Sequence, residues 1–378
     1  MPGIYIHIPF CVRKCAYCDF VSFEDHARMG AYLAALQKEM ALCAPAFSGR
    51  VYDTVFFGGG TPSILPSGAA AALMEALRGS FCIRPDAEVT IECNPGTADA
   101  AKLAEYRAAG VNRLSFGVQS ADDGLLCRIG RIHTFSDFLQ SYEQARAAGF
   151  SNINADVLYG LPGQTPGLHL ATLERVCALG LQHISAYSLI LEPGTPLYES
   201  GCTLPDEDAA YAMHRNTIEF LEGQGYARYE VSNYAQPGYM CWHNLNYWDN
   251  GEYVGLGLNA HSAARLEDSG WTRWSNTADL GAYIAAAGRG ELPVLERENI
   301  GRQEERFESV MLGLRKTQGI DLARFEARFG ACFLSAYPES VLELERRGWL
   351  EVAGGFARLT PEGLDMQNQA LLLFLEEN

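Results

Sequence analysis

The sequence lacks several features that would point to a membrane or to a nucleic acid. It has no run of about 18 apolar residues, so it predicts no transmembrane helix. Met1-Pro2-Gly3 leads directly into an apolar stretch, without the basic region of a signal peptide. Basic residues are few, with 29 Lys and Arg against 46 Asp and Glu and a net charge of −17. The missing transmembrane run and signal peptide predict a cytoplasmic protein. Because such an acidic surface repels phosphate groups, we expect no nucleic-acid partner.

A nucleotide-binding loop is also absent. The glycine-rich segment GGGTPS at 58–63 has neither the lysine of a phosphate-binding P-loop nor the G-x-G-x-x-G spacing of a dinucleotide fold. Its glycines still allow the backbone to approach a ligand closely. Thr61 is expected to cap the following helix, with Pro62 in its first turn. The segment therefore predicts a loop that contacts a small ligand.

Cysteine, by contrast, is abundant, with eleven residues in the chain. Cys11, Cys15 and Cys18 follow one another with the spacing C-x3-C-x2-C. Three thiols are an odd number for disulfides and one short of a closed structural zinc site. They match a 4Fe–4S cluster in which three irons are bound by cysteine and the fourth iron is open. A zinc ion completed by a distant His or Cys is the alternative.

Apolar runs alternate with helical patterns along the first half of the chain. The runs that predict strands are 4–8, 52–57, 88–92, 113–118, 152–159 and 183–190. Several of the intervening helices are followed by a glycine before the next strand, and these glycines are Gly110, Gly149, Gly180 and Gly225. Serial strand–helix units of this kind predict a parallel sheet. Six units are too few for a closed eight-stranded barrel, so we expect an α/β fold with a partial (βα)6 barrel.

Polar or glycine-rich segments follow all six predicted strands. The cysteine loop follows the first strand and GGGTPS follows the second. Glu92 ends the third strand, Gln119 the fourth, and Asp156 lies in the fifth. In parallel barrels the active site lies at the carboxyl ends of the strands. We therefore expect one site at this end of the barrel.

Taken together, these motifs resemble a known superfamily. The cysteine spacing with Tyr17 before the last cysteine resembles the radical S-adenosylmethionine (radical SAM) superfamily. The segments YIHIPFC, FFGGGTPS, ECNPGT, RLSFGVQS, DVLYGLPGQT and HNLNYW resemble the oxygen-independent coproporphyrinogen III oxidase group, and above all the HemW-type haem chaperones within it. Two features differ from the true oxidases. Phe20 stands where the oxidases carry a further cysteine, and only three residues precede the first strand.

The resemblance implies roles for individual residues. It implies that Cys11, Cys15 and Cys18 bind a 4Fe–4S cluster. It implies that S-adenosylmethionine is bound by Tyr5, Tyr17, Gly59, Gly60, Thr61 and Glu92. Gln119, Arg131 and Asp156 match positions that the oxidase group uses for a second S-adenosylmethionine. Two of these have plainer alternatives, since Arg131 could pair with a surface carboxylate and Asp156 could be a charge that neutralises a helix.

The aromatic segment 241–262 carries the chaperone-like motif HNLNYW. Haem needs an apolar slot and often an imidazole ligand. His243 is therefore a candidate ligand for haem iron, and Cys241 is a weaker one. The alternative is that the aromatic side chains close the open side of the barrel and His243 only forms hydrogen bonds. His7, in the first strand, has two possible roles. It could face the barrel interior near the cluster, or it could be a core histidine with a backbone hydrogen-bond partner.

Three domains are expected from these patterns. They are a radical SAM partial barrel at 1–225, an aromatic-rich extension closing the barrel at 226–290, and a small winged-helix-like α+β domain at 291–378. The last domain is expected to contain two helices separated at Gly319 and then a helix followed by a hairpin. Because it is not basic, we expect a structural or partner-binding role for it rather than DNA binding.

The sequence thus favours a 4Fe–4S protein that binds haem and delivers it to haem-accepting proteins. The first alternative is an anaerobic coproporphyrinogen III oxidase. The second is a radical SAM enzyme that modifies or opens haem. Phe20 and the short leading segment weigh against the oxidase.

Overall fold

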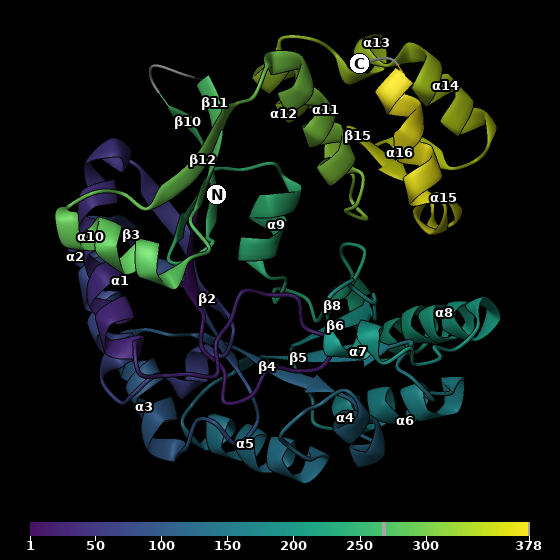
Figure 1. The fold of residues 1–378 in the computed structure, drawn as a ribbon. Coiled ribbons are helices and arrows are strands. Elements are labelled where there is room, and N and C mark those ends of the chain that lie inside the picture. Colours follow the sequence, from purple (N-terminus) through teal and green to yellow (C-terminus); the bar gives the residue numbers. More distant parts are fainter. Residues whose placement is uncertain (267–269, 377–378) are drawn as a thin grey trace.

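The computed structural model describes residues 1–266 and 270–376, so the expected ranges 226–290 and 291–378 each include a few residues outside the described part. Within that part, the main feature is a 12-stranded sheet with the order β12-β11-β10-β9-β1-β2-β3-β4-β5-β6-β8-β7. The sheet is strongly curved, and most helices of the first 225 residues cover its convex side (Figure 1).

Six parallel strands form the centre of the sheet, as the sequence predicts. They are β1 (Gly3–Ile8), β2 (Val51–Gly59), β3 (Cys82–Cys93), β4 (Arg113–Gln119), β5 (Asn152–Tyr159) and β6 (His183–Ser188). The helices between and after them are α1 (Met29–Cys43), α2 (Ala69–Ser80), α3 (Ala100–Ala109), α4 (Asp123–Arg128), α5 (Phe135–Ala147), α6 (Pro166–Cys177), α7 (Pro196–Glu199) and α8 (Glu207–Gly223), with short 3₁₀ turns at Ala44–Phe47 and Pro62–Ile64. The expected partial barrel is confirmed.

The glycine joints behave as the sequence predicts. Gly110 ends α3 with a φ of 97°, and its N–H bonds to the carbonyl oxygens of Arg107 and Tyr106. A side chain with a β-carbon adopts this left-handed conformation only at a cost, which explains why glycine stands at the joint. Helix α5 begins with a capping box, in which Thr134 and Asp137 each bond to the other's backbone N–H.

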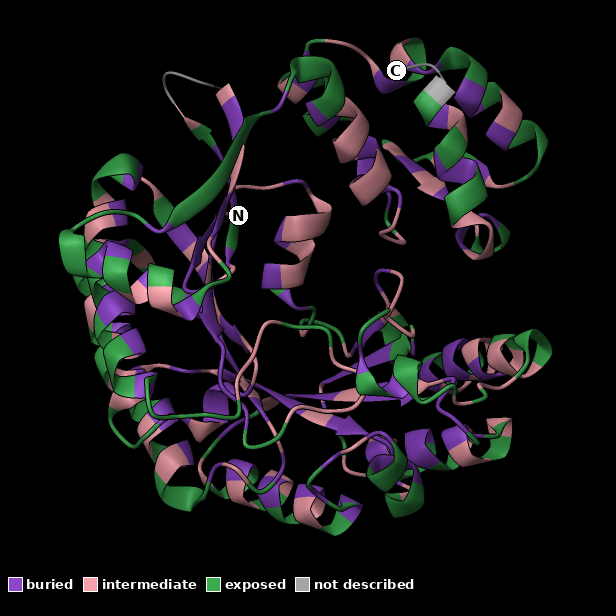
Figure 2. Cartoon of the chain, viewed as in Figure 1, coloured by how far each residue is buried: buried purple, intermediate pink, exposed green. Residues whose placement is uncertain are grey.

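The two faces of the central strands differ in chemistry. Ile4, Ile6 and Ile8 of β1 are fully buried in the apolar core beneath the helices. Tyr5 and His7 point to the opposite, concave face, because successive side chains of a strand alternate. Figure 2 shows the central strands almost wholly buried and the outer sides of the helices exposed. The concave face is therefore the place where polar side chains meet inside the barrel.

The aromatic-rich segment extends the sheet at one edge and does not join its two ends. Strand β9 (Tyr253–Leu256) pairs in parallel with β1, and β10 (His261–Leu266), β11 (Gly270–Asn276) and β12 (Val294–Asn299) follow in antiparallel order. Short strands β7 (Ala227–Arg228) and β8 (Asn233–Ala235) flank β6 at the other edge. Helix α9 (Trp242–Trp248) lies on the concave side (Figure 1). Strand β12 belongs to the large sheet, although the sequence boundary at 290 assigns it to the C-terminal domain.

A buried carboxyl group fastens this extension to the barrel. Glu39 of α1 is 3% exposed and accepts hydrogen bonds from Gly257 N, from Asn276 Nδ2 and from the hydroxyl group of Tyr283. Tyr283 lies on α10 (Leu280–Arg289), which packs against α1. Burial raises the pKa of Glu39 from its usual value of 4.5 to about 7, although the three donors oppose this shift.

The C-terminal domain has an apolar core of its own. Its small sheet has the order β13-β15-β14, formed by β13 (Ile320–Asp321), β15 (Phe356–Leu359) and β14 (Leu350–Ala353). Its helices are α11 (Arg302–Gly313), α12 (Leu322–Phe329), α13 (Phe333–Ala336), α14 (Pro338–Arg346), α15 (Pro361–Asp365) and α16 (Gln367–Glu376). The expected break at Gly319 and the hairpin after a helix are both present, in a winged-helix-like order.

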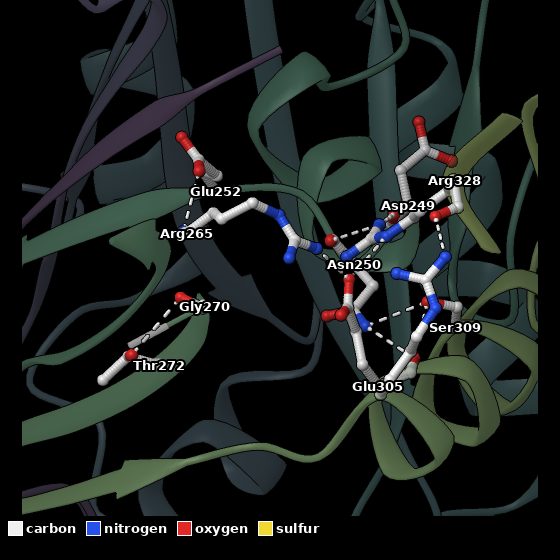
Figure 3. Close-up of polar contacts among 10 residues, drawn as sticks. Asp249, Asn250, Glu252, Arg265, Gly270, Thr272, Glu305, Ser309 and Arg328 are labelled. Atoms are coloured by element: carbon white, nitrogen blue, oxygen red, sulfur yellow. Dashed lines mark hydrogen bonds and ion pairs between the residues drawn. The ribbon is translucent and has the colours of Figure 1, made fainter. Parts of the chain in front are cut away.

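An ion cluster around the buried carboxylate of Glu305 joins this domain to the extension (Figure 3). The carboxylate of Glu305 accepts from Arg265 Nη2 at 2.6 Å and from Arg328 Nε at 2.9 Å. Arg328 also donates to the carbonyl oxygens of Asp249 and Asn250, directly after α9. The C-terminal domain thus holds the carboxyl end of α9 in place. Within the described residues, no helix has the length and apolar character needed to cross a membrane.

Glu39 provides a test of this arrangement through the pH dependence of stability. Because its folded-state pKa of about 7 lies above 4.5, its contribution to stability is complete below pH ~4.5 and is lost as the pH rises through 7. We expect the free energy of unfolding to fall by roughly 3 kcal/mol across this window. Urea unfolding of Glu39→Gln should lack this fall. The exposed helical variant Glu143→Gln should keep it, and identical profiles for Glu39→Gln and wild type would refute the assignment.

Candidate functional site

Two adjoining cavities occupy the concave side of the six central strands. The outer chamber, of about 370 Å³, is lined by the cysteine loop, the glycine loop and the carboxyl ends of the strands. The inner chamber, of about 250 Å³, lies between the strands and α9. The residues that line the outer chamber include Cys11, Cys15, Tyr17, Cys18, Gly59, Gly60, Thr61, Glu92, Gln119, Arg131 and Asp156. Tyr5 lines the inner chamber. The structure thus gathers around these two adjoining chambers all the residues that the sequence singled out for cluster and cofactor.

The cysteine loop is fixed by backbone hydrogen bonds to two other segments. Cys11 N donates to Phe23 O at 2.9 Å, and Ala16 N donates to Ile129 O at 3.0 Å. His7 donates from Nε2 to Val21 O at 3.0 Å and contacts the hydroxyl group of Tyr5 through Nδ1. His7 therefore has the backbone partner of a core histidine and holds the returning end of the loop.

Two donors point at the sulfur atoms of the loop. The hydroxyl group of Thr61 donates to Cys11 Sγ at 3.6 Å, and Arg131 Nη1 donates to Cys15 Sγ at 3.3 Å. The expectation that Thr61 caps the next helix is wrong, because its side chain makes no capping bond there and turns to Cys11 and Asn94 instead. Burial raises the pKa of Cys18 to about 11, so a bound metal must displace the thiol proton.

The glycine loop runs directly beside the first cysteine. Gly60 N donates to Ile8 O at 2.9 Å, and Thr61 N donates to Phe10 O at 2.8 Å. A β-carbon at Gly60 would lie 2.7 Å from Phe10 O and 3.0 Å from Cys11 Sγ. Only glycine fits between the two segments, as the sequence predicts for a close approach of the backbone.

Glu92 lies in the wall shared by the two chambers. It accepts a hydrogen bond from Gly59 N at 3.3 Å. Burial, with a further contribution from Asp156, raises the pKa of Glu92 to about 8. A cationic ligand beside it would favour the ionised form, so the group is suited to a ligand that carries an ammonium or sulfonium charge.

Gln119, Arg131 and Asp156 also line the outer chamber. Gln119 has a φ of 65° at a register shift between β4 and β5, a strained conformation that is typical of functional sites. Arg131 donates to Asn94 Oδ1 at 2.7 Å and to Gly117 O, so the alternative of a surface ion pair is not realised. Asp156 accepts from Ser115 Oγ and Asn154 Nδ2, and burial raises its pKa.

The chemistry of this chamber fits a cluster of several irons. Three thiols line one cavity, two donors point at their sulfur atoms, and a glycine leaves space beside Cys11. Among residues 1–266 and 270–376, no three His, Cys, Asp or Glu side chains are placed to hold a single metal ion. A 4Fe–4S cluster distributes its ligands over separate irons, one thiolate for each.

His243 of α9 is buried beside the inner chamber. Its Nδ1 lies 2.8 Å from Thr54 Oγ1, and its Nε2 lies 3.0 Å from the hydroxyl group of Tyr247. Its ring stacks on Phe56 with 5.1 Å between the ring centroids. Both ring nitrogens thus have partners, so the imidazole can reach an iron only after one of these hydrogen bonds breaks. Cys241 is fully buried against Glu88.

Glu88 of β3 fixes the amino end of α9. Its carboxylate accepts from Trp242 N at 3.2 Å and from His243 N at 3.1 Å, and Cys241 Sγ lies 3.4 Å away. A carboxylate at a helix amino terminus satisfies free N–H groups and complements the helix dipole. This contact determines where the histidine lies in the barrel.

A prediction based only on the ends of the strands misses several residues that line the two chambers. The signal that reveals them is a period of two along the strands, which puts alternate residues on one face. It applies to Arg113 and Ser115 of β4, to Asn154 of β5 and to Ser185 and Tyr187 of β6, all of which line the inner chamber. Glu88 lies in β3. Asn94, which bridges Thr61 and Arg131, follows that strand directly.

Comparison with known proteins places these features in a family. Residues 5–176 match the model of the radical SAM superfamily, and residues 300–366 match that of the HemN C-terminal domain. The chain is 35% identical over 385 residues to the haem chaperone HemW of Bacillus subtilis, covering 100% of both chains. It is 35% identical over 380 residues to the haem chaperone HemW of Escherichia coli, covering 99% of this chain and 98% of the relative.

A solved structure shares the fold along almost the whole chain. Coproporphyrinogen III oxidase (HemN) of Escherichia coli, a radical SAM enzyme, is 25% identical to this chain with a TM-score of 0.85. The match covers 99% of this chain and 89% of that enzyme. The barrel and the C-terminal domain therefore occur together in both proteins.

Gly60 provides a test of the outer chamber. Because a β-carbon there would press on Phe10 O and Cys11 Sγ, we expect Gly60→Ala to reduce the iron content after anaerobic reconstitution well below about four per chain. Binding of S-adenosylmethionine should fall with it. Gly79→Ala, on an open part of α2, is the matched control and should retain full iron content. If Gly60→Ala binds iron and S-adenosylmethionine as fully as wild type does, the glycine loop is an ordinary turn without a role in the site.

Proposed function

The chain belongs to the HemW family within the radical SAM superfamily, and we propose that it binds haem and delivers it to haem-accepting proteins. The observation that carries this proposal is the full-length similarity to proteins named haem chaperone HemW, on a barrel that keeps the cysteine loop. We place the protein in the cytoplasm, whose reducing conditions suit a chain of eleven cysteines of which none forms a disulfide within the described residues.

Membership of the superfamily implies a 4Fe–4S cluster and S-adenosylmethionine. We assign the cluster to Cys11, Cys15 and Cys18, and when bound it would supply one-electron chemistry and an open iron position. Gly59, Gly60 and Thr61 would lie along the methionyl part of S-adenosylmethionine, with Tyr5, Tyr17 and Glu92 at its other contacts. Gln119, Arg131 and Asp156 form the wall where a second S-adenosylmethionine would bind.

We assign the haem iron to His243, which is uncharged because burial lowers its pKa to about 3. A neutral imidazole has a lone pair available for a metal. Ligation through Nε2 requires the hydrogen bond to Tyr247 to break, at a cost of roughly 1 kcal/mol or more. The stacked ring of Phe56 and the edge of Tyr247 provide apolar surface beside it. The haem therefore binds where α9 faces the inner chamber.

The fold match to coproporphyrinogen III oxidase gives a second candidate function, radical oxidation of coproporphyrinogen III. Phe20 weighs against it. Its side chain is 61% exposed and borders both chambers at the position where the oxidases have a further cysteine. An apolar ring at this position favours binding of an apolar molecule. It cannot take part in a reaction that requires a thiol.

One pair of assays separates the two functions. Titration of the purified protein with haem should produce a saturable Soret shift with one haem per chain. Anaerobic incubation of the reconstituted protein with coproporphyrinogen III, S-adenosylmethionine and a reductant should leave the porphyrinogen unchanged. Formation of protoporphyrinogen would transfer the assignment to the oxidase, and the absence of any haem binding would remove the chaperone assignment.

The ligand assignment has its own matched pair of variants. His243→Gln should shift the Soret maximum or abolish the iron–imidazole spectrum, because the amide is a poor iron ligand. His261→Gln is the control, since His261 lies on the exposed side of β10. Circular dichroism should show that both variants are folded. A His243→Gln protein with the wild-type haem spectrum would show that another group binds the iron.

A further inference from the structure

Arg113 lines the inner chamber from the amino end of β4 and is 2% exposed. Within the described residues, its guanidinium group forms no hydrogen bond and no ion pair, and Nε is buried without a partner. Arg131, by comparison, donates three hydrogen bonds across the outer chamber.

Of the three carboxylates that lie near Arg113, Glu92 accepts a hydrogen bond from Gly59 N and forms no ion pair with the guanidinium group. Glu88 uses both oxygens for the backbone N–H groups of Trp242 and His243 at the start of α9. Asp156 uses both oxygens for Ser115 and Asn154. Neither Glu88 nor Asp156 forms an ion pair within 4 Å of the guanidinium group. Both carboxylates act on Arg113 only by longer-range electrostatic attraction.

A guanidinium group stays charged at every physiological pH. Burying such a charge without a partner costs several kcal/mol, and so buried charges are normally paired or bound to a ligand. An unpaired buried cation that faces a cavity therefore indicates a site for an anion. Its planar fork of donors matches a carboxylate, which can accept two parallel hydrogen bonds.

The two sides of the inner chamber differ in polarity. Tyr5, Phe56, His243 and Tyr247 form an aromatic wall, in which Phe56 stacks between Tyr5 and His243. Arg113, Ser115, Asn154, Asp156 and Ser185 form the polar wall. An apolar arm that ends in an anionic group would match both walls.

The size and the opening of the chamber limit what it can take. Its volume of about 250 Å³ is below the roughly 300–1,000 Å³ of pockets that enclose whole drug-sized ligands. It opens to the outer chamber through a shared wall that includes Phe20, Glu92 and Tyr187. A larger molecule at this opening would therefore place only one arm inside.

We propose that Arg113 anchors a carboxylate-binding site in the inner chamber, and that a propionate arm of the tetrapyrrole occupies it. The second half of the proposal rests on the haem-binding function proposed above. The methionyl carboxylate of S-adenosylmethionine is the other source of the same chemistry. The arm would bring the ring edge close to Phe56 and His243, which line the same chamber.

Haem and haem dimethyl ester, whose propionates are esterified, test the site without any change to the protein. Because a hydrogen-bonded charge pair contributes about 1.5–3 kcal/mol, wild type should bind haem roughly tenfold to hundredfold more tightly than the ester. In Arg113→Met the affinity for haem should fall to that for the ester, while the affinity for the ester is unchanged. Arg113→Lys keeps the charge and should keep part of the preference for haem over the ester. It replaces Arg113→Met in the test if the methionine variant does not fold.

The same proteins are then titrated with S-adenosylmethionine. A tenfold loss of its binding in Arg113→Met, with an unchanged preference for haem over the ester, would assign the carboxylate to S-adenosylmethionine and overturn the tetrapyrrole half of the proposal. Unchanged binding of all three compounds in a folded Arg113→Met protein would overturn the site altogether. If wild type binds neither haem nor the ester, the chaperone function fails, and the S-adenosylmethionine titration alone decides the site.

Discussion

The pairing of β1 between β2 and β9 is the constraint on which the rest of the structure depends. Both pairings are parallel, with Gly3 opposite Thr54 on one side and Tyr253 on the other. They direct the carboxyl end of β1, and hence the cysteine loop, to the end of the barrel where the glycine loop and Glu92 lie. A slip by one residue would exchange the buried isoleucines with Tyr5 and His7 and would empty the site. The contacts around Gly3, where a β-carbon would lie 2.7 Å from Thr54 Oγ1, leave no space for such a slip.

The sequence predicts those parts of the fold and site whose signals are local. Six strands, their glycine joints and the break at Gly319 follow from the order of apolar runs and turn residues. The gathering of Cys11, Gly60, Glu92 and Asp156 at one end follows from a general rule for parallel strands. The roles of these residues toward cluster and cofactor come from the family resemblance and stay predictions.

The parts that could not be predicted depend on contacts between distant segments. Nothing near Thr61 indicates that its hydroxyl group turns to Cys11 and Asn94 instead of capping a helix. Glu88 and α9 are more than 150 residues apart, and no local pattern pairs them. Strand β12 has only exposed side chains, so its sequence does not show that it pairs with β11. Arg113 reads as an ordinary first residue of a strand, and only the folded barrel shows that its neighbours are already engaged.

The position of β1 also has a consequence for the order in which the chain folds. Its partner β2 follows after some forty residues, but β9 is made only when the ribosome has passed residue 256. Until then the edge of β1 that will receive β9 has free N–H and C=O groups and can pair with another chain. Contacts so far apart in sequence also slow folding. Nascent chains that stall before residue 253 should thus carry a complete cysteine loop on a sheet that is still open to aggregation.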